Sequence, residues 1–164
     1  ISTIESGQEL DLKSVDLLRL SNEVLEIVEN HAKEKNITIK FKRQNPKGVL
    51  VVADEAKVRQ VLVNLIINAI KYGKDGGKIS IGFFDMDKNI LTEISDDGMG
   101  ISEEHLPRLF ERFYRTDKGR SRDQGGSGLG LAIVKHIIEG HKQTINIRST
   151  VGVGSTFGFT LKKG

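Results

Sequence analysis

The chain has 164 residues, of which 37% are hydrophobic and 29% charged, and its formal net charge is +3. This composition is ordinary for one globular domain, and the length suffices to bury a sizeable core. The absence of cysteine excludes disulfides, thiolate metal sites and cysteine nucleophiles. No apolar run has the length of a membrane span, and no basic helix carries interleaved aromatic residues, which disfavours nucleic-acid binding.

The beginning of the chain predicts a helix and a β-hairpin. Residues 1–13 are expected to be the end of a preceding element. Ser14 is a candidate cap for a helix that runs to about Lys35, with apolar residues at helical spacing. Apolar alternation at 37–41 and an apolar run at 49–52, separated by the turn-forming sequence NPKG, predict two strands joined as a hairpin.

The middle of the chain predicts a second helix and two more strands. Asp54 is a plausible cap for a helix over about 55–72. The segments 78–84 and 90–95 have the composition of strands and are joined by a short turn. Residues 97–127 show no sustained periodicity beyond short helical turns, and a connection of this length is typical of a lid or a binding loop.

The end of the chain predicts a third helix at about 128–139 and a hairpin of strands at 144–149 and 156–161. Gly152 and Gly154 lie between these two strands and favour a tight turn. Together, the elements place helices on one face of a mixed sheet, which is a two-layer α/β sandwich.

One polar stripe runs along the second predicted helix, which is otherwise apolar. At about 100° per residue, Gln60, Asn64, Asn68 and Lys71 fall within a narrow arc, and a buried helix directs such a stripe at something polar. Two amides one turn apart suit a hydrated magnesium ion, Lys71 suits phosphates, and Tyr72 offers a ring edge to a base. The alternative is that the asparagines bond internal backbone groups and trapped water.

The first glycine-rich loop is 96–100, with the sequence DDGMG. Asp96 ends a predicted strand beside backbone that a ligand can approach closely. Its carboxylate can accept a hydrogen bond from an exocyclic amine, which distinguishes adenine from guanine. Asp-Gly pairs also favour tight turns, and Asp97 needs no further role.

The second glycine-rich loop, Gly126-x-Gly128-x-Gly130, opens directly into the third predicted helix. Free N–H groups and the positive end of a helix dipole bind polyphosphate oxygens. The spacing fits neither a Walker loop nor a dinucleotide fingerprint. The preceding segment 109–115 is basic and aromatic. Its arginines suit phosphoryl charge, whereas in the plainer interpretation its aromatic residues only anchor a loop.

These motifs, in this order, resemble those of the catalytic ATP-binding domain of bacterial sensor histidine kinases, in the GHKL ATPase group. Residues 64–72 are similar to the N box, 96–100 to the G1 box, 110–115 to the F box and 126–131 to the G2 box. The resemblance covers nearly the whole chain, and four motifs in order make it highly specific.

The resemblance implies a Bergerat-type ATP-binding fold of the α/β (α+β) class, in which about three helices cover one face of a mixed sheet. Residues 14–164 would form the catalytic domain, with an ATP lid at about 97–127. Residues 1–13 resemble the tail of a dimerisation and phosphoacceptor helix, or a linker from it. The sequence departs from the family at 141–143, where relatives often carry glycines, so the local turn is left open.

The resemblance also implies the roles of individual residues toward ATP and Mg²⁺. Asp96 would bind the adenine amino group, and Asn68 would hold the magnesium ion with Asn64 close by. Lys71 and Arg115 would reach the phosphates and act in catalysis. The other residues expected to contact the nucleotide are Tyr72, Gly98, Gly100, Ile101, Phe113, Tyr114, Gly126, Ser127, Gly128, Leu129, Gly130 and Leu131.

The family's reaction transfers the γ-phosphoryl group of ATP to a histidine on an adjoining helical domain, from which an aspartate of a response regulator receives it. None of the four histidines here is followed by the acidic residue and proline of the phosphoacceptor motif, so the chain is expected to be the ATP-binding half. The expected partners are the helical domain of the same parent protein and a response-regulator receiver domain, with no nucleic acid and no direct membrane contact. The expected location is the cytoplasmic part of a membrane-anchored sensor.

Three other functions share this pocket. A GHKL hydrolase would carry a glutamate base one turn before the metal-binding asparagine, and Asn64 stands at that position. A serine kinase of the same group is disfavoured by the helical-domain remnant at the start of the chain. A nucleotide-sensing or docking module without phosphotransfer is consistent with the missing phosphoacceptor histidine, although Lys71 and Arg115 argue against it.

Overall fold

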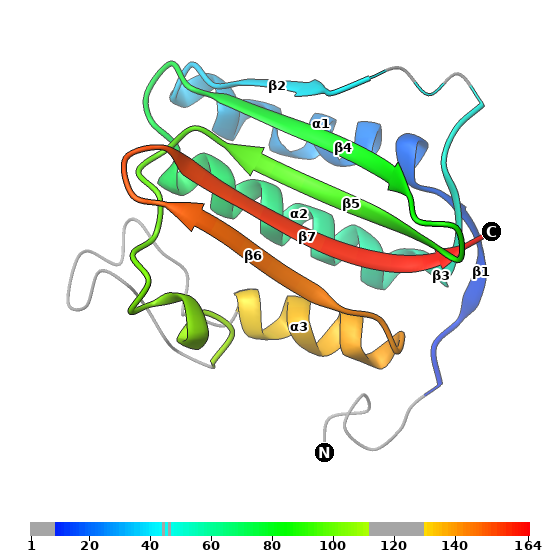
Figure 1. The fold of residues 1–164 in the computed structure, drawn as a ribbon. Helices are drawn as coiled ribbons and strands as arrows, with labels where there is room; N and C mark the ends of the chain where they lie inside the picture. Colours follow the sequence, from blue (N-terminus) through cyan, green and yellow to red (C-terminus); the bar gives the residue numbers. More distant parts are fainter. Residues whose placement is uncertain (1–8, 44, 46, 112–129) are drawn as a thin grey trace.

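The computed structural model describes residues 9–43, 45, 47–111 and 130–164 (Figure 1). In chain order, the elements are β1 (Leu12–Asp16), α1 (Leu17–Glu34), β2 (Thr38–Phe41), β3 (Leu50–Asp54), α2 (Glu55–Tyr72), β4 (Lys78–Asp85), β5 (Asn89–Asp96), the 3-10 turn η1 (Leu106–Arg108), α3 (Gly130–Gly140), β6 (Ile145–Thr150) and β7 (Gly154–Lys163). Within these described ranges, no helix combines the length and the apolar character that crossing a membrane requires.

The strands form one sheet in the order β1-β3-β7-β5-β4-β2, and β6 pairs with the first part of β7. β2 and β4 run parallel, and the other pairs are antiparallel. Figure 1 shows α1, α2 and α3 on the same face of this sheet. The expected two-layer sandwich, with three helices over a mixed sheet, is therefore confirmed.

The apolar core lies between the helices and the sheet, and α2 is at its centre. The buried residues of α2 are Val58, Val61, Leu62, Leu65, Ile66, Ala69 and Ile70. Those that β5 and β7 contribute are Ile90, Ile94, Phe157, Phe159 and Leu161. Because α2 packs against α1, α3 and the sheet, the core leaves only a limited arc of this helix open to polar side chains.

The first helix begins later than predicted, and the residues before it form a strand. β1 pairs with β3, with Ser14 opposite Val52, so Ser14 does not cap a helix. Asp16 caps α1 instead, since its Oδ1 accepts the backbone N–H groups of Leu18 (3.0 Å) and Val49 (2.9 Å). Both positions carry a good capping residue, and only the distant pairing with β3 decided between them.

The hairpin predicted for the segments at 37–41 and 49–52 is wrong. β2 pairs parallel with β4, with Ile39 opposite Ile79. β3 pairs antiparallel with β1 and β7, with Val51 opposite Val15 and Lys163. Apolar alternation identifies a strand but not its partner, and a parallel pair needs a long crossover, which here includes α2.

The remaining predicted elements agree with the structure. Asp54 caps α2, because its Oδ1 accepts the N–H of Lys57 (3.3 Å), and the helix has the predicted bounds. β4 pairs with β5, and β6 with β7, as antiparallel hairpins. α3 is described from Gly130 onward, and the expected lid at 97–127 falls partly outside the described residues.

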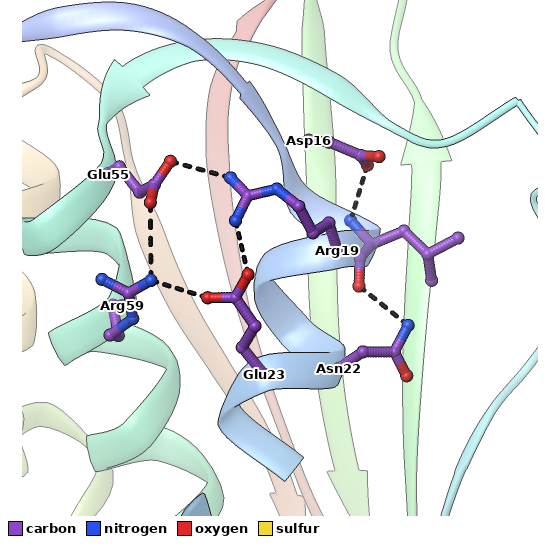
Figure 2. A network of polar contacts seen from close by, with 7 residues as sticks. Asp16, Arg19, Asn22, Glu23, Glu55 and Arg59 are labelled. Atoms are coloured by element: carbon purple, nitrogen blue, oxygen red, sulfur yellow. Dashed lines mark hydrogen bonds and ion pairs between the residues drawn. The ribbon is translucent and has the colours of Figure 1, made fainter. Parts of the chain in front are cut away.

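A closed ring of ion pairs fixes α1 against the start of α2 (Figure 2). Arg19 contacts Glu23 (2.5 Å) and Glu55 (2.7 Å), and Arg59 contacts the same two carboxylates at 2.7 Å and 3.4 Å. Exposed pairs of this kind contribute little to stability, because water screens the charges. The ring therefore serves mainly to set the position of α1 along α2, the helix that carries the polar arc.

Candidate nucleotide-binding site

The polar arc of α2 lies on a side of the helix that the core does not cover. Asn64, Asn68 and Lys71 are half-buried on this arc, and Gln60 is exposed. Nδ2 of Asn64 donates to the carbonyl oxygen of Gly130 (3.4 Å), so the arc faces the start of α3. Amide oxygens are hard ligands that suit Mg²⁺. In the described part of the chain, no three His, Asp or Glu side chains are grouped to hold a metal ion.

The first glycine-rich loop packs directly on the end of this helix. The N–H of Met99 donates to the carbonyl oxygen of Tyr72 (3.5 Å). A Cβ added to Gly98 would collide with that carbonyl oxygen and would lie 2.9 Å from Cα of Gly73. Only glycine allows this approach, so the expected site residues at the ends of α2 and β5 are brought together by backbone contact.

The loop leaves the site along the β6–β7 hairpin. Gly100 has a φ of +76°, and a Cβ there would collide with the carbonyl oxygen of Thr150. The N–H of the next residue, Ile101, donates to Oγ of Ser149 (2.7 Å). That hydroxyl in turn donates to the carbonyl oxygen of Gly154 (3.0 Å). The loop is therefore held at both ends by groups that belong to other elements.

Asp96 lies half-buried at the end of β5, on the side of the sheet that faces the helices. Its Oδ1 accepts the N–H of Gly98 (2.9 Å). Burial raises the pKa of the Asp96 carboxyl above its ordinary value, and the N–H groups of Gly98 and Ser155 offset part of that rise, while the charge of Asp97 adds to it. A carboxylate held in this way can accept a hydrogen bond from a ligand amine.

Sequence reasoning missed the role of Ser149 and Ser155 in this corner. Their hydroxyl oxygens lie 2.7 Å apart, and Ser149 also holds Ile101, as described above. The one sequence signal is that Ser149 takes an inward position on β6, where Ile145 and Ile147 precede it. A polar residue at an inward position departs from the apolar pattern, but the sequence does not show which loop the hydroxyl contacts.

Part of the expected site lies outside the described residues: Phe113, Tyr114, Arg115, Gly126, Ser127, Gly128 and Leu129. Before that gap, the ring of Phe110 packs edge-on against Phe157, with centroids 6.3 Å apart. After it, Leu131 is half-buried against the core, and Gly130 begins the described part of α3. Of the two described ends, Gly130 therefore lies next to the polar arc, where Asn64 bonds to its carbonyl, and Phe110 packs on β7.

Comparisons with known proteins identify the family and the fold of the chain. The model of the histidine kinase-, DNA gyrase B-, and HSP90-like ATPase family matches residues 53–164. The chain is 37% identical to the sensor histidine kinase YkoH of Bacillus subtilis, over 91% of this chain and 32% of that protein. It is 38% identical to the sensor-like histidine kinase SenX3 of Mycolicibacterium smegmatis, over 98% of this chain and 42% of that protein. The chain thus spans less than half the length of these relatives.

Solved structures of histidine kinases have the same fold. Full-length ShkA in complex with AMPPNP matches 95% of this chain and 32% of its own, at 30% identity and a TM-score of 0.82. ThkA in complex with the response regulator TrrA matches 98% of this chain and 45% of its own, at 29% identity and a TM-score of 0.79.

Proposed function

The chain belongs to the histidine kinase-, DNA gyrase B-, and HSP90-like ATPase family, and we propose that it is the Mg-ATP-binding catalytic half of a sensor histidine kinase. The γ-phosphoryl group of ATP passes to a histidine on an adjoining helical domain of the parent protein and then to a response regulator. The names of the relatives, and the crystal structure of ThkA in complex with a response regulator, support this proposal. We also propose that the domain works on the cytoplasmic side of a membrane-anchored sensor.

One observation carries the nucleotide assignment. Asp96 is half-buried and ends its strand beside Gly98, and Gly98 sits against the carbonyl of Tyr72 so closely that no side chain fits. At the end of β5, the carboxylate of Asp96 therefore lies beside a glycine backbone and beside the end of α2, the helix that carries the amide and lysine side chains. This combination suits an aminopurine joined to a polyphosphate.

Different residues of the chain bind different parts of the nucleotide. Asp96 accepts the hydrogen bond of the adenine amino group, and Gly98 and Gly100, which pack against the carbonyls of Tyr72 and Thr150, hold the loop beside the base. Lys71 and Arg115 stabilise negative charge on the phosphates as the bond to the leaving oxygen lengthens and the bond to the histidine nitrogen forms. Gly126, Ser127, Gly128, Leu129 and Gly130 offer backbone N–H groups to the same phosphates at the start of α3.

The fit to a magnesium ion rests on the amides of α2. Asn68 is the proposed ligand, and Asn64, which already bonds the carbonyl of Gly130, lies one turn away on the same arc. When bound, Mg²⁺ neutralises charge on the phosphate oxygens. If these amides hold the ion, the phosphates bound to it would lie between α2 and the start of α3.

Calorimetric titration with ATP and GTP, each with and without Mg²⁺, tests the pocket. We expect saturable, ATP-selective binding in the micromolar-to-millimolar range, about −8 to −4 kcal/mol. A second assay adds the separately purified helical domain of the parent protein and follows the γ-phosphate. Labelled histidine supports the kinase, free phosphate alone supports a hydrolase, and labelled serine supports a serine kinase. Binding without any transfer supports a sensing module, and absence of binding refutes the nucleotide assignment.

A further inference from the structure

Lys35, the residue after α1, contacts the end of α2 with its whole ammonium group. Its Nζ donates to three carbonyl oxygens, those of Ile70 (3.0 Å), Lys71 (2.8 Å) and Gly73 (2.9 Å). The side chain is half-buried. An ammonium has three protons, and here all three are used on one backbone turn.

These bonds meet a need that every helix end has. The last carbonyl groups of a helix have no partner within it, and the end carries partial negative charge, which a cation stabilises. The backbone of Lys35 joins the same corner, since its carbonyl oxygen accepts the N–H of Gly76 (2.8 Å). The loop between α2 and β4 is therefore held from both the side chain and the main chain of one residue.

The carbonyl of Tyr72 lies between two of those acceptors, and the loop at 96–100, which carries Asp96, packs against it. Lys35 binds the carbonyls of Lys71 and Gly73, and the carbonyl of Tyr72 between them accepts the N–H of Met99. Gly98 fits against Tyr72 and Gly73 with no room for a Cβ. A shift of the helix end by a few tenths of an ångström would therefore push on the loop that carries Asp96.

We propose that Lys35 is a positioning residue for the adenine end of the nucleotide site, acting through the end of α2 on residues 96–100. The proposal rests on the proposed function. Lys35 touches neither base nor phosphate in this scheme. It holds the surface against which Gly98 packs and thereby sets the position of Asp96, whose Oδ1 bonds to Gly98.

This role makes a prediction that a simple helix cap does not. Loss of Lys35 should weaken the binding of every ligand that contains adenine by the same factor, because the change affects the position of Asp96 at the base. ATP and ADP should lose affinity alike, and the factor by which Mg²⁺ strengthens ATP binding should not change. A residue that only stabilises the fold would lower the melting temperature without changing affinity well below it.

The experiment compares Lys35→Met with Lys35→Arg, which keeps a cation with several donors, and with Lys33→Met. Lys33 is a matched control, since its side chain is 71% exposed and its nearest ion-pair partner, Glu29, lies 3.9 Å away. We expect Lys35→Met to weaken ATP and ADP binding about tenfold, the equivalent of one hydrogen bond to a charged group. Lys35→Arg should recover most of the affinity, and Lys33→Met should match the parent.

A second measurement needs no nucleotide. Amide hydrogen exchange of the peptide that covers residues 96–101 should be faster in Lys35→Met than in Lys33→Met. If Lys35→Met does not fold, Lys35→Gln replaces it in both measurements.

The two readouts separate failure of this inference from failure of the proposed function. Unchanged ATP affinity in Lys35→Met, whether or not the variant is destabilised, or unchanged exchange at 96–101, overturns the positioning role. A loss confined to the Mg²⁺ response also overturns it. If the parent does not bind ATP, the proposed function falls and the role toward adenine falls with it, while faster exchange at 96–101 still shows that Lys35 holds this loop through the end of α2.

Discussion

The backbone N–H of Asp54 donates a hydrogen bond to Nε2 of His141 (3.1 Å), which joins the residue that caps α2 to the turn after α3. Nδ1 of the same imidazole lies 2.9 Å from the carbonyl oxygen of Ile137. Since Nε2 accepts, Nδ1 carries the proton and donates. The carboxylate of Asp54 meanwhile accepts the N–H groups of Lys57 and Asp11 (3.3 Å and 3.1 Å). The start of the helix with the polar arc is therefore tied to two separate segments, the residues before β1 and the turn after α3.

Substitution of His141 should destabilise the domain. His141→Ala leaves the N–H of Asp54 without its acceptor, and we expect the free energy of unfolding to fall by about 1–3 kcal/mol. Urea denaturation measures the loss. His31→Ala, at an exposed position of α1, is the control and should have little effect. Equal losses in the two variants would show that water replaces the imidazole.

Lys142 adopts a backbone conformation that glycine prefers. Its φ is +61°, in the turn that follows α3. Lys142→Gly should raise the free energy of unfolding by about 1 kcal/mol, because a Cβ is strained in the left-handed region. Lys142→Ala keeps the Cβ and should give no gain. A gain in Lys142→Ala as large as that in Lys142→Gly would contradict the backbone explanation.

Gly98 should not tolerate even one methyl group. Gly98→Ala places a Cβ against the carbonyl of Tyr72, so we expect a loss of about 1–3 kcal/mol in unfolding free energy and a loss of ATP binding. Gly140→Ala is the matched control, because its Cβ would meet nothing within 4 Å. Thermal unfolding and calorimetry of both variants check the expectation. ATP binding by Gly98→Ala at the affinity of the parent would argue against the close approach.

Asp96→Asn should abolish adenine selectivity with little loss of stability. The raised pKa of the Asp96 carboxyl means that the folded state binds more protons than the unfolded state between the ordinary pKa and the raised one. Stability contributed by this group therefore falls as the pH rises through that window. Relative to the parent, Asp96→Asn should gain stability from below the ordinary carboxyl pKa of about 4 up to neutral pH.

The nucleotide affinity of the parent should change in the opposite direction. Binding of ATP requires the ionised acceptor, so affinity should fall as the pH drops through the raised pKa of Asp96. Urea denaturation and ATP titration across this pH range test both trends. Asp97→Asn, whose wild-type carboxylate accepts the N–H of Lys78 (2.9 Å), is the control and should keep adenine selectivity. Equal ATP binding by Asp96→Asn and the parent would refute the role of Asp96.

Asn68→Ala should remove the Mg²⁺ dependence of ATP binding and leave weak nucleotide affinity. The amide oxygen is the proposed ligand, and adenine contacts at the other end of the site do not need it. ATP titrations with and without Mg²⁺ measure the ratio of the two affinities. Gln60→Ala, at an exposed position of the same arc, should retain the ratio of the parent. A full Mg²⁺ response in Asn68→Ala would exclude this residue as the ligand.

Elements whose signals are local could be predicted from the sequence. Asp54 caps α2 with a side-chain bond that spans three residues, and the apolar spacing of the helix needs no knowledge of the sheet. The hairpins β4–β5 and β6–β7 join neighbouring strands through short turns. The polar arc of α2 and the glycine-rich loops were visible for the same reason, since their spacing lies within one element.

Errors and omissions arose where two distant segments meet. Ser14 and Asp16 are both good caps, and the pairing of β1 with β3 determined which one acts. Lys35 looks like an ordinary surface lysine at the end of a helix until α2 presents three carbonyls to it.

Helical and strand periodicity and glycine spacing are short-range properties, so the amino-acid sequence was enough to predict the class of fold, the helix with its polar arc and the motifs of the family. Packing of the whole chain was needed to select which strands pair, which cap acts and which groups hold the loop at Asp96. Those choices depend on hydrogen bonds between segments far apart in the chain, and many pairings satisfy the same local pattern until the whole core packs.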